Sequence, residues 1–350
     1  MSNVLVLNSG STSVKYKLFA ADETELAGGQ FAEKDFKSNI KQLLRQVVAF
    51  GDIEAVGHRV VHGGWQFSRP TIVTSAVMNE LSELNYLAPL HNPHNLAGIE
   101  AVADFLPQAP QIAVFDTGFF SELPDQAKTY ALPRDIASKY HIRRYGFHGL
   151  SHEYAMGEAS AQLGKKTDKI NLVSCHLGGG SSVAAIKQGR PVDISNGYTP
   201  AEGLMMQTRT GDIDPGLVIE LMYLLPGEIN EDKVGEVYRL INEESGWKGL
   251  TGGICDFRDL LREVSLGQPA ALAAFDVFTY RIAKYIGAYY AVLEGAVDAI
   301  VFTGAIGAGN PATRQAVMRK LRHLSSLPIL AINTNEELNI ARKVKLTIAR

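Results

Sequence analysis

The chain has 350 residues, of which 46% are hydrophobic and 20% are charged, a composition that indicates a globular protein and excludes a disordered one. Because a single hydrophobic core stops growing near about 250–300 residues, this length predicts two domains. The net charge of −3 provides no large basic field, which argues against nucleic-acid binding, and the 33 glycines are clustered rather than periodic, which excludes collagen-like repeats.

The N-terminal residues predict two strands joined by a polar turn. Residues 4–7 form an apolar run typical of a buried strand, and residues 14–19 alternate in polarity as a half-buried strand does. The residues between them, 8–13, have turn chemistry. A similar unit follows at 170–186, with the glycine-rich loop 176–182 between its strands. Two such hairpins half a chain apart predict a duplicated core, with one copy in each domain.

Further apolar runs end in polar or glycine-rich loops at 55–61, 112–115 and 299–302. Strands that end in this way are typical of an α/β fold whose site lies at the strand ends. Residues 270–297 carry apolar side chains at steps of three and four, which predicts a long amphipathic helix. Shorter helices are expected at 39–50, 311–324 and 336–350. The segment 143–149 is the best candidate for a domain boundary.

The cysteines and the hydropathy pattern predict a cytoplasmic protein. Cys175 and Cys255 do not make a disulfide framework, and we expect both to be reduced. The N-terminal segment lacks the basic and apolar regions of a signal peptide, and no apolar run approaches the ~20 residues that span a bilayer.

The two glycine- and serine-rich loops are candidates for phosphate binding. Consecutive backbone N–H groups in a tight turn bind anions, and Lys15 beside the first loop can neutralise a phosphate charge. An ordinary hairpin turn explains each loop as well. No Walker-type run is present, and Gly304, Gly307 and Gly309 lack the dinucleotide-binding spacing.

Several charged residues lie where functional groups are often placed. Asp116 ends a strand, where a carboxylate can hold a metal or cap a helix. Arg59 lies among apolar residues and must be paired, either with a substrate or in a structural ion pair. Arg209 lies in the polar stretch 208–216, whose acidic residues can cap a helix that follows.

The histidines do not predict a zinc site, because no H-E-x-x-H motif occurs and acidic or cysteine partners at ligand spacing are missing. His148 lies between glycines and is four residues from His152, so the start of a helix can stack the two rings. A core histidine explains either one alone. The Ser151-His152 pair lacks the G-x-S-x-G elbow of a serine hydrolase.

Eight segments, in order and over nearly the whole chain, resemble the acetate and propionate kinase family. They are Asn8–Ser11, Gly57–Gly64, Leu87–Pro93, Phe115–Thr117, Tyr145–Gly149, Thr199–Leu204, Thr208–Pro215 and Asn333–Leu338. The resemblance implies a two-domain α/β fold of the actin-like and sugar-kinase ATPase type with a duplicated βββαβαβα core. It implies an N-terminal domain at 1–143 and a nucleotide-binding domain at 144–335, with helix 336–350 packing back onto the first.

The resemblance also implies the chemistry. The expected reaction is reversible, Mg²⁺-dependent transfer of a phosphoryl group from ATP to a short-chain carboxylate, foremost acetate, by direct in-line attack. A carboxylate has a pKa near ~4 and is already a nucleophile at neutral pH, so no general base is needed. The site must instead position the reactants and neutralise charge. A homodimer that binds a small carboxylate and a nucleotide, but neither nucleic acid nor membrane, is implied.

The resemblance also implies a role for each residue that matches a motif of the family. Asp116, His148 and Arg209 are implied as catalytic residues, and Asn8 and Glu336 join Asp116 on the magnesium side. The substrate is implied to contact Arg59, Val61, Leu90, His91, Phe147 and Pro200. The nucleotide is implied to contact Lys15, His176, Leu177, Gly178, Gly179, Gly180, Asp256, Phe257, Arg258, Ala305, Ile306, Gly307, Ala308 and Gly309.

Some positions depart from the family pattern. Gly179 stands where Asn is usual, residues 305–309 replace a Gly-Ile-Gly-Glu-Asn stretch, and Phe120 stands where His is usual. The alternatives are therefore an acyl kinase with propionate or butyrate as acid, one with pyrophosphate or another nucleotide as donor, or a non-catalytic nucleotide-binding homologue. One methylene is worth only about 1–3 kcal/mol in such a pocket, so these residues do not separate acetate from propionate. The chain is also shorter than family members, with the shortfall expected at 19–56 and 310–333.

Overall fold

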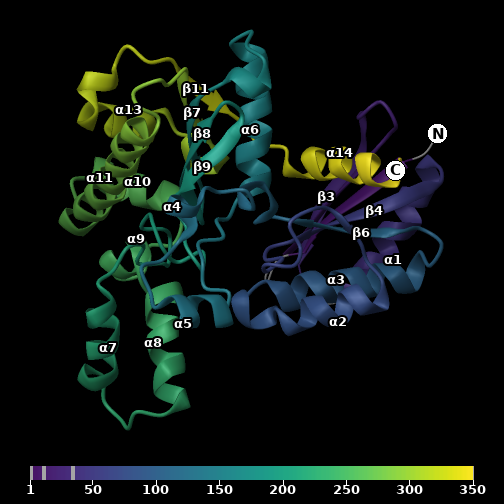
Figure 1. Ribbon diagram of the computed structural model, residues 1–350, viewed down its shortest axis with the longest axis horizontal. Coiled ribbons are helices and arrows are strands. Elements are labelled where there is room, and N and C mark those ends of the chain that lie inside the picture. The colour runs from purple at the N-terminus through teal and green to yellow at the C-terminus, as the bar shows by residue number, and fades with distance from the viewer. Residues whose placement is uncertain (1–2, 10–12, 33–35, 350) are drawn as a thin grey trace. The chain divides into compact units, whose positions relative to one another are not determined.

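The computed structural model describes residues 3–9, 13–32 and 36–349. The chain forms two compact units, and each is considered by itself. Unit 1 comprises Met1–Ser121, Phe147–Tyr154 and Asn335–Arg350. Unit 2 comprises Glu122–Gly146 and Ala155–Thr334. Each unit contains a β-sheet with helices packed on it (Figure 1).

The sheet of unit 1 has the strand order β3-β2-β1-β4-β6-β5. β1, β2 and β3 pair antiparallel, whereas β1, β4 and β6 are parallel. The strands are β1 (Asn3–Ser9), β2 (Ser13–Phe19), β3 (Glu25–Ala32), β4 (Ile53–Val60), β5 (Thr71–Ile72) and β6 (Gln111–Phe115). The strands predicted at 4–7, 14–19, 55–61 and 112–115 are confirmed. Of the predicted turn at 8–13, residues 10–12 lie outside the described ranges.

Helices cover both faces of this sheet, which explains why β1 is apolar on both sides. Successive side chains of a strand point to opposite faces. Leu5 and Leu7 pack in one buried cluster with α1 and α3, whereas Val4 and Val6 pack in another with α14. The helices of unit 1 are α1 (Phe36–Val47), α2 (Ser75–Glu83), α3 (Asn92–Phe105) and α14 (Glu336–Ile348).

The last helix, α14, packs on the first sheet through a close contact at Gly57 of β4. A Cβ added to Gly57 would lie 2.7 Å from a methyl group of Ile340 and 2.7 Å from one of Val344. Real Cβ atoms do not approach other atoms so closely, so glycine is required for α14 to lie this near the strand. This contact brings the first turn of α14 to the sheet that carries Arg59.

The sheet of unit 2 repeats the arrangement of unit 1. Its order is β11-β10-β7-β8-β9, with β7, β8 and β9 antiparallel and β7, β10 and β11 parallel. The strands are β7 (Leu172–Leu177), β8 (Ser181–Lys187), β9 (Arg190–Ile194), β10 (Ala299–Thr303) and β11 (Ile329–Ile332). In each unit a three-stranded antiparallel meander is extended by two parallel strands, so the duplicated core and the α/β fold are confirmed.

The long helix α11 (Pro269–Val292) organises the core of unit 2. Its Phe278, Ile282 and Ile286 are buried in one cluster with β7, β8 and β10. The remaining helices are α4 (Asp125–Lys128), α5 (Arg134–Lys139), α6 (Gly149–Gln162, which begins in unit 1), α7 (Pro215–Leu224), α8 (Glu231–Glu243), α9 (Gly246–Leu250), α10 (Phe257–Ser265), α12 (Gly304–Gly307) and α13 (Pro311–Lys320). Short 3-10 turns occur at Val48–Phe50, Asn85–Leu87, Gly118–Phe120, Thr167–Lys169 and Arg322–Leu324.

The helices predicted at 39–50, 270–297, 311–324 and 336–350 are confirmed with small shifts of their ends. Strand β3 was not predicted, because its sequence contains Gly28 and Gly29 and lacks clear alternation. It is an edge strand that pairs with β2, and Gly29 lies against the ring of Tyr16, where a Cβ would come within 2.9 Å. None of the helices in the described ranges combines the length and apolar character needed to cross a lipid bilayer.

Candidate functional site

Four of the residues singled out in the sequence meet at the strand ends of unit 1. Arg59 near the end of β4 donates from Nε to both carboxylate oxygens of Asp116, at 3.0 and 3.1 Å, and from Nη2 to Oδ2 at 2.5 Å. Its Nη1 donates to Oδ1 of Asn8 in β1 at 3.2 Å. Glu336, the first residue of α14, places Oε2 4.0 Å from the same Nη1. We call these residues the Arg59 cluster.

The parallel order of the sheet explains this meeting. β1, β4 and β6 are neighbours, and Val60 pairs with Phe115, so Asn8, Arg59 and Asp116 lie at one edge of the sheet. Lys15 on β2 pairs with Asn8 and is exposed.

The position of Glu336 is set by the capped N-terminus of α14 and by a hydrogen bond from Ser151. The side chain of Asn335 caps the N-terminus of α14 by accepting from the Leu338 N–H at 3.2 Å, and the Ser151 hydroxyl donates to Glu336.

The Arg59 cluster is strongly charged and little exposed. The side chain of Asp116 is 2% exposed and that of Arg59 is 21% exposed. Burial alone would lower the pKa of Arg59, but the carboxylates of Asp116 and Glu336 outweigh burial and raise it. Burial raises the pKa of Asp116, and the charge and hydrogen bonds of Arg59 oppose that shift. A forked guanidinium–carboxylate pair has the geometry of two ionised groups.

Two asparagines that sequence reasoning missed hold the loop after β4. The Asn95 side chain accepts from the Val61 N–H at 3.0 Å and donates to the Ser9 carbonyl at 2.5 Å. The Asn92 side chain accepts from the His62 N–H at 3.1 Å and donates to the His62 carbonyl at 2.9 Å. Both asparagines are buried and lie three residues apart in the first turn of α3. That spacing was the available signal, since it puts both on one face of the helix.

Three of the substrate residues predicted in unit 1 lie in sequence next to β4 or α3, the two elements that adjoin or hold this loop. Val61 follows β4, Leu90 and His91 precede α3, and all three are half-buried. Phe147 is buried, and its ring lies edge-on to His62, with the ring centroids 5.4 Å apart.

His148 lies at a constrained point of the backbone, at the start of α6. Its φ is 58°, and it follows the buried Phe147. The next residue, Gly149, donates its N–H to the Asp116 carbonyl at 3.0 Å. A Cβ added to Gly149 would lie 2.2 Å from that oxygen. The glycine therefore lets the His148 segment lie directly on the backbone of Asp116, and the two predicted catalytic residues of unit 1 are brought together.

His58 has a structural role. It is buried and shares a hydrogen bond of 2.7 Å with Gln111, which is also buried. Burial lowers the pKa of His58 to about 4, so the ring is neutral at physiological pH. Because side chains alternate along β4, His58 points to the face of the sheet opposite Arg59.

In unit 2 the glycine-rich loop closes as a tight turn between β7 and β8. The Gly178 N–H donates to the Gly180 carbonyl at 3.0 Å and to the Ser181 hydroxyl at 3.2 Å. The other predicted nucleotide loop, 305–309, lies beside it, because β10 pairs with β7 and Gly304 packs on the Leu177 backbone. His176, the first of the predicted loop residues, is the next-to-last residue of β7 and is half-buried.

Arg209 and Pro200 lie together in unit 2. The Arg209 guanidinium donates to the Pro200 carbonyl at 3.3 Å, and burial lowers the pKa of Arg209. Asp214 caps α7 by accepting from the Gly216 N–H at 2.7 Å, so the predicted helix cap is confirmed.

A partly buried network that the sequence did not reveal supports the Pro200 loop. Arg144 donates to Glu202 at 2.6 Å and to the Asn196 carbonyl at 2.7 Å, and the Tyr130 hydroxyl also donates to Glu202. The Asn196 side chain donates to the carbonyls of Pro200 and Glu202. The partners of Arg144, and Tyr130 and Glu202, are more than 50 residues apart in the chain, so no local pattern joins them.

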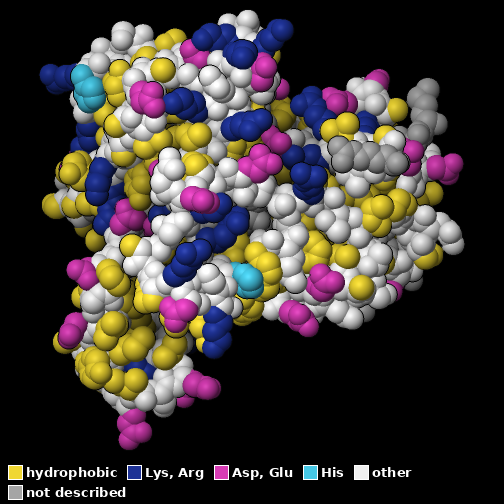
Figure 2. All heavy atoms as spheres, in the orientation of Figure 1, with side chains coloured by type: hydrophobic (Ala, Val, Ile, Leu, Met, Phe, Trp, Pro, Cys, Tyr) yellow, Lys and Arg dark blue, Asp and Glu magenta, His cyan; other side chains and the backbone are white. Residues whose placement is uncertain are grey.

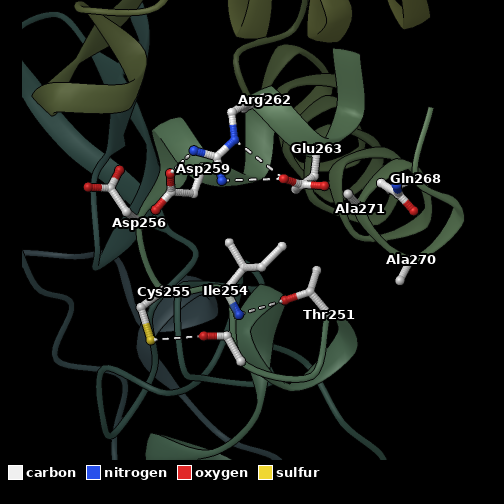
Figure 3. A pocket seen from close by; sticks show the side chains of 11 residues that line it. Thr251, Ile254, Cys255, Asp256, Asp259, Arg262, Glu263, Gln268, Ala270 and Ala271 are labelled. Carbon is white, nitrogen blue, oxygen red and sulfur yellow. Dashed lines mark hydrogen bonds and ion pairs between the residues drawn. The ribbon is translucent and has the colours of Figure 1, made fainter. Parts of the chain in front are cut away.

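Unit 2 contains a cavity of about 620 Å³, and the predicted nucleotide residue Asp256 is one of the residues that line it (Figure 3). Asp256 caps α10, and its carboxylate pairs with the exposed Arg258 at 2.6 Å. Phe257 is not among the residues that line the cavity. Its ring centroid lies 5.4 Å from that of Trp247 and 5.6 Å from that of Phe278. The remaining walls come from α10, the start of α11 and the loop 251–255.

The oxygen atoms of the Arg59 cluster suit magnesium. Mg²⁺ takes oxygen ligands, is commonly held by one or two carboxylates together with substrate phosphates, and keeps several waters. Asp116 and Glu336 supply two such carboxylates, and Asn8 supplies an amide oxygen. Over the described ranges, no three His, Cys, Asp or Glu side chains form a group that could hold a metal ion.

The model of the Acetokinase family matches residues 30–345 of the chain. The acetate kinase of Fervidobacterium nodosum is 40% identical over 403 residues, which cover 99% of this chain and 98% of that protein. The acetate kinase of Thermotoga maritima is 38% identical over 399 residues, with 98% of both chains covered. Both alignments are longer than the 350-residue chain, so these relatives carry insertions relative to it.

Solved structures agree with these relatives. The acetate kinase of Porphyromonas gingivalis has a TM-score of 0.89 at 35% identity, with 100% of both chains covered. A propionate kinase from Francisella tularensis has a TM-score of 0.91 at 32% identity, with 98% of this chain and 99% of that chain covered. The ROK hexokinase of Thermus thermophilus, at a TM-score of 0.52 and 12% identity, shares the fold alone. The family model spans most of the chain and the relatives cover nearly all of it, so the chain belongs to the acetokinase family.

Proposed function

We propose that the protein transfers the γ-phosphoryl group of ATP to acetate, reversibly, to give acetyl phosphate and ADP. A carboxylate oxygen of acetate forms the new bond to phosphorus, and the bond from phosphorus to the bridging oxygen of ADP breaks. No proton is transferred in this step. The observation that carries the proposal is the Arg59 cluster, which sets a half-buried guanidinium among carboxylates at the strand ends.

Arg59 is proposed to bind the carboxylate of acetate. A guanidinium has five N–H groups in a planar fork, more than Asp116 and Asn8 use. A second carboxylate can therefore bind bidentately, which orients its oxygen for attack. Val61, Leu90 and Phe147 are apolar and suit the methyl group, and Pro200 is assigned to the substrate by its motif. His91 is proposed to contact the substrate.

His148 and Arg209 are proposed to stabilise the equatorial oxygens of the transferring phosphoryl group. Negative charge on those oxygens must be neutralised, and positioned donors contribute most when they are desolvated. The half-buried guanidinium of Arg209 and the constrained backbone of His148 support such roles.

We assign Mg²⁺ to Asp116, Glu336 and Asn8, with water completing the coordination. When bound, the ion would neutralise phosphate charge. The nucleotide is assigned to Lys15, the loops 176–180 and 305–309, and the cavity beside Asp256.

A kinase assay across donors and acids tests the function. Acyl phosphate formed from ATP, GTP or pyrophosphate with acetate, propionate or butyrate would be trapped with hydroxylamine and measured. We expect the highest kcat/KM with ATP and acetate, because the phosphoryl-transfer residues are present. The propionate kinase among the similar structures favours propionate as the second acid. The proposal is wrong if ATP yields no acyl phosphate with any of these acids.

A homodimer is proposed on the strength of an apolar surface on α7 and α8. Tyr223 and Leu224 are each 70% exposed, and Ile219 and Val234 are 58% and 51% exposed. Figure 2 shows hydrophobic side chains gathered over these two helices. Contiguous apolar surface of this kind marks interaction sites in soluble proteins. Light scattering is expected to give twice the chain mass of 38.0 kDa, and a mass of one chain would contradict the dimer.

A cytoplasmic location is likewise proposed. The exposed Cys255 and the buried Cys175 are both free thiols, which suits a reducing compartment.

A further inference from the structure

In unit 2 a side chain from another segment lies against the glycine-rich loop. Gly179 is exposed at the tip of the loop and has no side chain. A Cβ added there would lie 3.0 Å from Oε1 of Gln207. The carboxamide of Gln207 therefore occupies the space that a side chain at position 179 would fill.

The backbone of Gln207 is fixed on both sides. Its N–H donates to the Gly179 carbonyl at 3.3 Å, and its carbonyl accepts from the Lys248 N–H at 3.0 Å. Gly246, with a φ of 65°, packs so closely that a Cβ would lie 2.6 Å from the Gln207 carbonyl oxygen. The backbone from which the carboxamide extends is thus fixed by the packing of two neighbouring segments, and the side chain itself is half-buried.

The chemistry of a carboxamide suits this position. It offers two N–H donors and a carbonyl acceptor without a charge, so it can donate to a phosphate oxygen while accepting from a backbone N–H. The loop beneath it is a tight turn whose glycines leave the backbone accessible. Arg209, which is proposed to neutralise the transferring phosphoryl group, lies two residues further along the chain.

We propose that Gln207 binds the phosphoryl donor, and that its carboxamide replaces the side chain missing at Gly179. The inference rests on the proposed function for the identity of the donor. It assigns donor recognition to a residue outside the loops singled out in the sequence. It also predicts that positions 179 and 207 act as one unit.

A double-mutant cycle tests this coupling. Gln207→Ala removes the carboxamide and is expected to raise the Kd for Mg·ATP, measured by calorimetry, and the KM for ATP by about tenfold. The KM for acetate should stay within about twofold, since Gln207 is not assigned to the acid. Gly179→Asn alone is expected to weaken ATP binding as well, because its side chain meets Gln207. The double variant should bind ATP within about threefold of the wild type.

Matched controls lie on α6. Gln162→Ala removes an exposed glutamine, and Gly157→Asn adds a side chain where nothing lies within 4 Å. Both should bind ATP as the wild type does. The inference is overturned if Gln207→Ala binds ATP normally, if the acetate KM rises equally, or if the effects of the two substitutions multiply.

Calorimetry separates this inference from the proposed function. A wild type that binds ATP but forms no acyl phosphate would refute the proposed function, and the cycle would still decide the role of Gln207. A wild type that does not bind ATP would refute both.

Discussion

Replacing Arg59 with alanine is expected to lower kcat/KM for acetate by about 1,000-fold, with binding of ATP retained. Removing one member of a buried charge pair costs about 2–5 kcal/mol, and 1,000-fold corresponds to about 4 kcal/mol. The acid would lose its bidentate partner and its orientation for in-line attack. ATP binding should persist, because the residues assigned to the nucleotide other than Lys15 lie in unit 2. Steady-state kinetics and calorimetry with ATP would measure the two effects.

The same substitution should also destabilise unit 1, and a second variant separates the two consequences. Without Arg59, the carboxylate of Asp116 would be buried without its partner, which typically costs about 3–5 kcal/mol. In the Arg59→Ala, Asp116→Asn double variant the unpaired negative charge at position 116 is also removed. Its free energy of unfolding in urea should recover, whereas its activity should not. An Arg59→Ala variant with an unchanged KM and kcat for acetate would contradict the role of Arg59.

Replacing Gly149 with alanine is expected to lower kcat by about 100-fold and the free energy of unfolding by about 3 kcal/mol. The new methyl group would lie 2.2 Å from the Asp116 carbonyl oxygen and 2.9 Å from the Cβ of Phe119. One segment must shift, and either shift separates His148 from Asp116. Chemical denaturation and single-turnover kinetics would give the two quantities.

The same helix provides the control. Gly157 of α6 has nothing within 4 Å of an added Cβ, so Gly157→Ala should be tolerated. It is expected to stabilise the protein by about 0.4–1 kcal/mol, because alanine restricts the unfolded chain more than glycine does. If Gly149→Ala and Gly157→Ala lost activity equally, α6 would be sensitive to any change. The contact between Gly149 and Asp116 would then not explain the loss.

The sequence predicted the repeated hairpins and the polar strand ends, because these depend on local patterns of hydrophobicity. It also marked Arg59 and Asp116, but as separate candidates. Their pairing follows from β4 and β6 being parallel neighbours, which no spacing in the sequence records. The Arg59 cluster further needs Glu336, which lies more than 200 residues away from Asp116 and reaches it only through the packing of α14.

The residues that hold the loops of the site in place are less predictable from the sequence than the Arg59 cluster itself. Asn92 and Asn95 resemble ordinary helix-start residues until the loop that they hold is seen. The Arg144–Glu202 pair joins segments whose contact depends on the tertiary fold. His58 shows the opposite case, because a histidine next to Arg59 in the sequence points to the other face of the strand. Side-chain partners set by tertiary packing lie beyond what periodicity can predict.

The packing of α14 on Gly57 has a consequence for the order of synthesis. Strands β1 to β6 leave the ribosome early, but the helix that covers Val4 and Val6 is made only after all of unit 2. At about 5–20 residues per second, that interval is on the order of 10–40 s. During this time one apolar face of the first sheet lacks the cover that α14 provides, and Glu336 has not yet been made. A nascent chain therefore remains inactive, and prone to aggregation at that face, until its last helix emerges.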